Sequence, residues 1–168
     1  MTDSFKSTFT VDRTPAEVFA AINTPQTWWN ELIEGSAAAV NHEFGFDMPG
    51  VHRTRIRVTE AVPGQRVVWR VLENNFSFVE DQDEWLGTDV VFDIEPGEAG
   101  TTVNLTHVGL VPQFECYEVC SGAWTHHLNA GLRALLTTGN PAPMTAQLAA
   151  QTARDFAAQG TAARPGDT

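Results

Sequence analysis

Histidine is the residue type in this chain best suited to acid-base chemistry near neutral pH, because its ring titrates there. His107 ends an alternating run beside Leu105, and we expect it to face the interior near the start of the following helix. In that place it could act as a general base or orient a ligand carbonyl. The alternative is a structural histidine bonded to the backbone at the end of a sheet, and the sequence leaves both readings open.

His127 is the second candidate for an acid or base. His126 and His127 are adjacent, so on a helix their side chains point about 100° apart and only one can face the core. His127 follows Trp124 by three residues on an apolar stripe. A zinc site built from His127 with Cys120 or His52 would need ligands at a recognised spacing, which the sequence lacks. We therefore expect no bound metal.

The two cysteines, Cys116 and Cys120, lie four residues apart in a predicted helix. Their side chains share a face, but helical geometry holds the two backbones too far apart for an easy disulfide. Neither belongs to a CxxC motif, and no HExxH accompanies them. Burial as small hydrophobic side chains is the simpler interpretation.

Aromatic residues are the strongest indication of function, with five Trp and ten Phe in 168 residues. Each one alone is expected to fill the core. An aromatic interior with isolated polar groups nevertheless suits a flat or hydrophobic ligand. The residues predicted to line such a site are Trp28, Phe44, Phe46, His52, Trp69, Phe76, Phe78, Trp85, His107, Phe114, Tyr117, Cys120, Trp124 and His127.

Composition narrows the possible partners. Ten basic against 21 acidic residues give a net charge of −11, which repels nucleic acids and anionic membrane surfaces. No apolar run approaches the roughly 18 residues of a membrane span, and no secretory signal is visible, so we expect a cytoplasmic protein. The chain has no GxSxG, GxGxxG or phosphate-loop motif, and we expect no cofactor.

One long helix, Gln113–Gly139, is the element on which the core must pack. Apolar residues recur along it at spacings of three and four, which builds one stripe. Gly139 is the residue type that most easily adopts the left-handed conformation that ends a helix. The stripe consists of Tyr117, Cys120, Trp124, Leu128, Gly131 and Leu135.

The rest of the chain predicts a sheet. A first strand, 4–12, is followed by two short helices, the first with a capping box from Thr14 to Glu17. About six antiparallel strands come next, several of them with clear alternation, and then the long helix. Residues 1–139 therefore form one α+β domain with a curved sheet wrapped on a helix, and such a sheet leaves a cavity that the helix cannot fill. Residues 140–168 are expected to be an extension, helical at first, with Met144, Leu148 and Phe156 on one face, and disordered from Gly160.

At this point a family resemblance is plain. The segments FTVDRTPAEVFAAINTPQTWW, VVWRV, TTVNLTHVGL and CSGAWTHHLNAGLRALLTTG resemble the SRPBCC (START-like) superfamily, and within it the homologues of the activator of the heat-shock protein 90 ATPase. The resemblance covers about residues 5–139. It implies the helix-grip fold, with about seven antiparallel strands, a long C-terminal helix and a deep cavity between them. Members bind lipids, hormones or polyketides, and some catalyse cyclisation or hydration.

Three hypotheses follow from these observations. The first is a binding domain for a small hydrophobic or aromatic molecule. The second is an enzyme, similar to cyclases or hydrolases, acting on a polyketide-like or aromatic substrate with His107 or His127 as acid or base; whether any reaction occurs is left open. The third is a co-chaperone-like interaction protein or a homodimer that uses its acidic surface or the extension from Asn140 onward.

Overall fold

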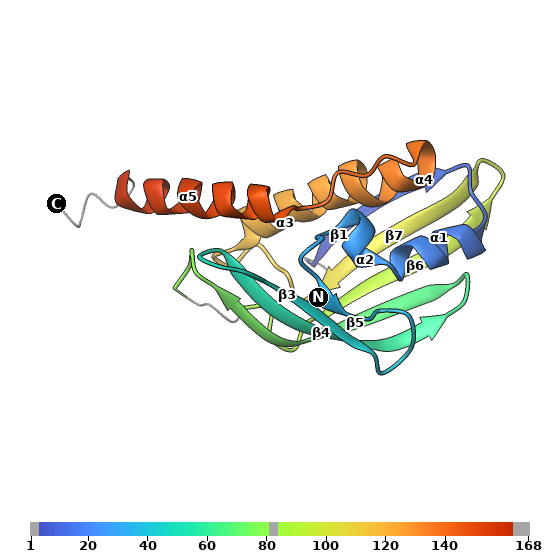
Figure 1. The fold of residues 1–168 in the computed structure, drawn as a ribbon. Helices are drawn as coiled ribbons and strands as arrows, with labels where there is room; N and C mark the ends of the chain where they lie inside the picture. Colours follow the sequence, from blue (N-terminus) through green and yellow to red (C-terminus); the bar gives the residue numbers. More distant parts are fainter. Residues whose placement is uncertain (1–3, 81–83, 163–168) are drawn as a thin grey trace.

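The computed structural model describes residues 4–80 and 84–162. The fold is of the α+β class: one strand and two short helices are followed by the remaining strands and then by the C-terminal helices (Figure 1). The elements are β1 (Phe5–Val11), α1 (Pro15–Ile22), α2 (Pro25–Trp28), β2 (Glu34–Gly35), β3 (Glu43–Met48), β4 (His52–Val62), β5 (Arg66–Phe76), β6 (Asp89–Gly97), β7 (Gly100–Val108), α3 (Tyr117–His126), the π-helix η1 (His127–Arg133), α4 (Ala134–Thr138) and α5 (Ala146–Ala162).

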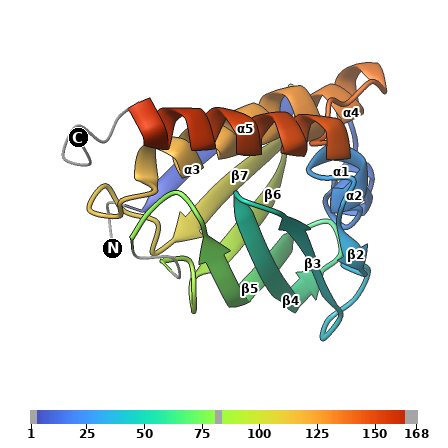
Figure 2. The same ribbon diagram turned by 60° about the vertical axis from the view of Figure 1, so that its left-hand side comes forward.

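Seven antiparallel strands form one sheet in the order β1-β7-β6-β5-β4-β3-β2. The sheet is curved, and the continuous helix α3-η1-α4 lies across its concave face (Figures 1 and 2). The two short helices α1 and α2 close one end of the same layer. This arrangement is the helix-grip fold that the sequence predicts.

Local sequence accounts for most element boundaries. The predicted capping box is present: Thr14 Oγ1 accepts from the Glu17 amide, and Glu17 accepts from the Thr14 amide. Alternation in β3 buries Phe44, Phe46 and Met48 on the concave face, as period-two patterning predicts. Gly139 adopts the left-handed conformation, with φ of 76°, and ends α4.

Glu60 does not point inward, although alternation along β4 predicts that it should. The pairing register between β4 and β5 shifts between Val58 and Glu60. Such a bulge adds a residue to one strand and turns the following side chains to the other face. Glu60 is exposed and forms an ion pair with Arg66, with 3.4 Å between Oε1 and Nε.

The long helix differs from its prediction in two respects. It begins at Tyr117 rather than at Gln113. The Glu84 carboxylate accepts the amides of Glu115 (2.8 Å) and Cys116 (3.0 Å) and holds the backbone just before the helix. Its middle is a π-helix. A π turn contains more than the α-helical 3.6 residues, so the buried face advances by about one residue. Leu136 is therefore buried, and Leu135 lies only partly inside.

The C-terminal extension returns along α3 as the helix α5 (Figures 1 and 2). Backbone hydrogen bonds tie the connecting segment to the domain. Glu31 N donates to Met144 O and Met144 N to Trp29 O, both at 2.9 Å, and Ala142 N donates to Ala130 O at 2.8 Å. Thr145 Oγ1 accepts the Leu148 amide and caps α5. The helix continues to Ala162, past the predicted start of disorder, and the rest of that predicted segment lies outside the described residues.

Packing in α5 follows a face that differs from the predicted one. Ala149 is buried, while Thr152 and Phe156 are partly buried and face the domain. The prediction is wrong for Leu148, whose side chain is 52% exposed. Met144 lies in the extended segment before α5, which begins at Ala146. Helical spacing counted from Met144 therefore does not predict which residues of α5 face the domain.

Tryptophan rings run through the centre of the core. Trp69 on β5 stacks with both Trp28 and Trp29, at ring-centroid distances of 6.4 and 5.9 Å. Trp85 stacks on Trp124 at 5.9 Å with an interplanar angle of 5°. Stacked aromatic rings bury large areas in a defined geometry, so these contacts contribute to the packing of the concave face.

Candidate functional site

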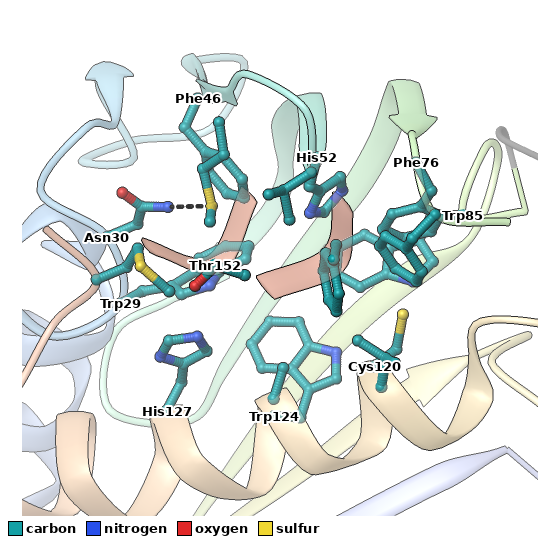
Figure 3. Close-up of a pocket in the computed structure, with 17 residues that line it drawn as sticks. Trp29, Asn30, Phe46, His52, Phe76, Trp85, Cys120, Trp124, His127 and Thr152 are labelled. Carbon is teal, nitrogen blue, oxygen red and sulfur yellow. Dashed lines mark hydrogen bonds between the residues drawn. The ribbon is translucent and has the colours of Figure 1, made fainter. Parts of the chain in front are cut away.

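A cavity of about 120 Å³ lies between the concave face of the sheet and the helices α3 and α5. Rings from β3, β4 and β5 face the side chains that rise from α3 and η1 (Figure 3). Two of the lining residues on α3, Val119 and Ala123, are exposed. They mark the mouth of the cavity, beside Thr152 and Phe156 of α5.

Eight of the residues that the sequence predicts for a ligand site line this cavity. They come from β3, β4, the end of β5 with the segment that follows it, and the helix α3-η1. They are Phe46, His52, Phe76, Phe78, Trp85, Cys120, Trp124 and His127.

The other six predicted residues lie elsewhere. Trp28, Phe44 and Trp69 form the packed floor beneath the cavity: Trp69 contacts Phe44 edge-on at 5.0 Å and stacks on Trp28. Alternation and helical spacing place these side chains on the correct face, but they do not show which of them a neighbouring ring covers. His107, Phe114 and Tyr117 are likewise absent from the described lining.

Sequence reasoning missed nine lining residues. Trp29 and Asn30 follow α2, Met48 and Val51 flank the β3-β4 turn, and Met144, Thr152 and Phe156 belong to the C-terminal extension. Val119 and Ala123 on α3 complete the set. The adjacent pair Trp28-Trp29 is a signal that could have found Trp29. When one ring of such a pair enters the core, the other is expected to contact a different part of the core. In the extension, the predicted apolar face with Met144 and Phe156 indicates packing on another surface, but the alanine-rich composition gives no indication of a ligand site.

His107 is a structural histidine in this structure. Its side chain is fully buried. The indole N–H of Trp124 can only donate, so His107 Nδ1 accepts it at 3.0 Å. The ring proton then lies on Nε2 and is donated to Thr88 Oγ1 at 2.7 Å, and the Thr88 hydroxyl donates to Trp85 O. Burial lowers the pKa of His107 to about 3, with a smaller contribution from His52.

His127 lines the cavity and has unused hydrogen-bonding capacity. Only 8% of the residue is exposed, and its buried Nδ1 has no hydrogen-bond partner among the described residues. Burial, with a smaller contribution from the neighbouring His126, lowers its pKa to about 4. The π-helix that begins at His127 is the kind of insertion often found at functional sites.

His52 faces the cavity from β4. Its Nε2 lies 2.7 Å from Asn74 Oδ1, and because an amide oxygen can only accept, the neutral ring carries its proton on Nε2 and presents Nδ1 as an acceptor. Burial lowers the pKa of His52 to about 4, partly offset by the Asn74 hydrogen bond. Both cavity histidines are therefore neutral at pH 7.

The two cysteines are free and buried. A hydrogen bond with Cys120, together with burial, raises the pKa of the Cys116 thiol. Within residues 4–80 and 84–162, no cluster of three or more His, Cys, Asp or Glu side chains could hold a metal ion. Over the same part of the chain, no helix combines the length and the apolar character needed to cross a bilayer.

Comparison with known proteins identifies the family of this sequence. The family described as Activator of Hsp90 ATPase homolog 1-like protein matches residues 12–137. The chain belongs to this family. The match includes β3 to α4 but ends before α5, so the Aha1-like domain supplies most of the cavity wall and the extension supplies the rest. No curated protein matches the sequence.

Solved structures share the fold of this Aha1-like chain. The solution structure of the Aha1 dimer from Colwellia psychrerythraea is 23% identical, covers 81% of this chain and 97% of its own, and has a TM-score of 0.66. DynU16, a protein of the dynemicin biosynthetic locus, is 17% identical over 83% of this chain and 49% of its own, with a TM-score of 0.61. CalU16 from Micromonospora echinospora is 17% identical over 91% and 84%, with a TM-score of 0.56.

Proposed function

We propose that this Aha1-like protein binds a small hydrophobic molecule in the cavity under α3 and α5. The observation that carries the proposal is the composition of the wall: aromatic rings from five segments converge on one partly enclosed space. Apolar pockets with a few polar groups are the usual form of small-molecule sites. The likeness of the fold to a protein from a biosynthetic locus also supports the binding of a small molecule.

Closing the mouth is expected to abolish binding. Ala123→Phe places a ring at an exposed lining position, so it should fill the entrance with little effect on stability. Titration with toluene, followed by tryptophan fluorescence, should show 1:1 binding to the wild type that is weakened at least about tenfold in the variant. N-phenyl-1-naphthylamine, followed by its own fluorescence, tests whether a larger molecule also enters. Trp29, Trp85 and Trp124 line the cavity and report on its occupancy.

The matched control for this test is Thr125→Phe. Thr125 is exposed on the same helix and is not part of the described lining, so it should leave both affinities unchanged. Native mass spectrometry of the protein as purified gives an independent reading of any bound molecule. Failure of both probes to bind the wild type, with no co-purified molecule, would overturn the proposal.

The extension is expected to contribute to the site. Phe156 of α5 lines the cavity and contacts the Phe78 ring at 4.9 Å, so Phe156→Ala should weaken toluene binding by about three- to tenfold through loss of apolar contact. Leu148→Ala on the same helix, away from the cavity, is the control. Equal affinities in the two variants would show that α5 plays no part in binding.

The enzymatic alternative rests on His127, because His107 already uses both ring nitrogens within the protein. A neutral histidine in an apolar wall can orient a substrate, and a turnover screen with His127→Phe as the negative control tests it.

Self-association is a separate proposal supported by the dimeric Colwellia neighbour. Sedimentation measurements on the full chain test that proposal.

A further inference from the structure

The size of the cavity limits what it can hold without rearrangement. Its volume is about 120 Å³, slightly below the engineered cavity of about 150 Å³ that accommodates benzene in another protein. The volume therefore limits the occupant to a single six-membered ring with at most one small substituent. A fused polycyclic molecule would require α5 to move away from the mouth.

The charge of the wall limits the ligand further. Among the described residues, no Asp, Glu, Lys or Arg lines the cavity. His52 and His127 are neutral at pH 7. A carboxylate, phosphate or ammonium group would lose its hydration on entering and would find no opposite charge there. The occupant is therefore uncharged.

Two imidazoles indicate which polar group the ligand carries. His52 presents an acceptor nitrogen, since its N–H is committed to Asn74. Among the described residues, the buried Nδ1 of His127 has no hydrogen-bond partner, and in the neutral ring one nitrogen is a donor and the other an acceptor. A hydroxyl both donates and accepts, so it can pair with either histidine, whereas a ketone or ether oxygen can only accept. A buried polar group left without a partner is unfavourable, so a ligand hydroxyl would stabilise the occupied state.

We propose that the ligand is a neutral, single-ring phenol, or an aromatic alcohol of the same size, whose hydroxyl hydrogen-bonds with His127. The aromatic ring then packs against Trp29 and Trp124, which lie beside His127 in the wall (Figure 3). This inference rests on the proposed function, because it assigns the chemical class of the molecule bound at the same site.

The experiment compares phenol, toluene and benzoate by NMR titration of the ¹⁵N-labelled full chain. Phenol and toluene have nearly the same shape, and benzoate adds a charge. In His127→Phe, the ratio of the phenol affinity to the toluene affinity is expected to fall at least tenfold relative to wild type, because only the phenol loses a partner. Exposed His126→Phe is the control and should keep the wild-type ratio. Benzoate should not bind to any of these proteins.

A measurement on the wild type alone guards against a variant that fails to fold. The ¹⁵N shifts of the His127 ring nitrogens should move on saturation with phenol and stay in place with toluene. An unchanged affinity ratio in His127→Phe, ring shifts that respond equally to both ligands, or binding of benzoate would overturn the inference. So would binding of N-phenyl-1-naphthylamine without either one-ring ligand, although the proposed function would stand. If none of the probes binds, the proposed function fails as well.

Discussion

Lowering the pH from 7 towards 5 is expected to destabilise this protein steeply. His52, His107 and His127 have native pKa values lowered to about 4, 3 and 4, whereas a histidine in the unfolded chain titrates near 6.5. Below pH 6.5 the unfolded chain therefore binds protons that the native protein does not. The free energy of unfolding falls as the pH falls, because proton uptake favours the state that binds more protons.

The size of the effect follows from the number of groups. Each histidine contributes up to about 1.4 kcal/mol per pH unit between its unfolded and native pKa, so the three together contribute about 4 kcal/mol per unit. A typical domain is stable by only about 5–15 kcal/mol. Urea denaturation at pH 7.5, 6.5, 5.5 and 5.0, followed by far-UV circular dichroism, measures the slope. Most of this window lies above the usual carboxylate range, so it isolates the histidines.

Variants separate the contribution of a single ring. His127→Phe removes one titrating group and should reduce the slope by about a third, without the loss of a protein hydrogen bond. His42→Gln replaces an exposed histidine and should leave the slope unchanged. A free energy of unfolding that stays constant from pH 7.5 to 5.0 in the wild type would contradict the prediction.

Gly131→Ala is expected to destabilise the protein by about 2–4 kcal/mol through overpacking. A Cβ atom at Gly131 would overlap the backbone carbonyl oxygen of Trp28. The carbonyl cannot move aside easily, because the Trp28 ring stacks on Trp69 and its indole N–H donates to Ala21 O at 2.9 Å. Relief of the overlap would separate α2 from η1 and disturb the stack.

Gly122→Ala, nine residues earlier in the same continuous helix, is the matched control with the opposite sign. A Cβ there meets no atom within 4 Å, so alanine should stabilise the helix by about 0.5–1 kcal/mol through its higher helix propensity. Thermal and urea denaturation of both variants at pH 7.5 measure the difference. Similar destabilisation by both substitutions would show that the contact with Trp28 is not the cause.

The fold was largely predictable because its elements carry local signals. The capping box at Thr14, the alternation through Phe44 and Phe46, and the helix-ending Gly139 each depend on neighbouring residues in the chain. Such short-range patterns hold whatever the rest of the structure does. The exceptions are Glu60, which a bulge turns outward, and the segment before α3, where Glu84 from a distant loop holds the backbone.

For the candidate site, the sequence predicted which residue types face the interior but not which of them line the cavity. Helical and strand periods select the residues that face inward, and eight of those chosen line the cavity. They do not separate Trp69, which other rings cover, from Trp29, which the cavity leaves accessible. That distinction depends on packing between segments far apart in sequence.

The sequence alone therefore determined the α+β order, the seven-stranded sheet and the aromatic character of the interior, since these follow from residue type and spacing. Tertiary structure decided which imidazoles remain available. His107 and His127 are equivalent candidates on paper, but the contact of His107 with Trp124 and Thr88 uses both of its nitrogens, while His127 lines the cavity with its buried Nδ1 unpartnered among the described residues. Hydrogen bonds between distant segments form only after folding, so no local pattern records them.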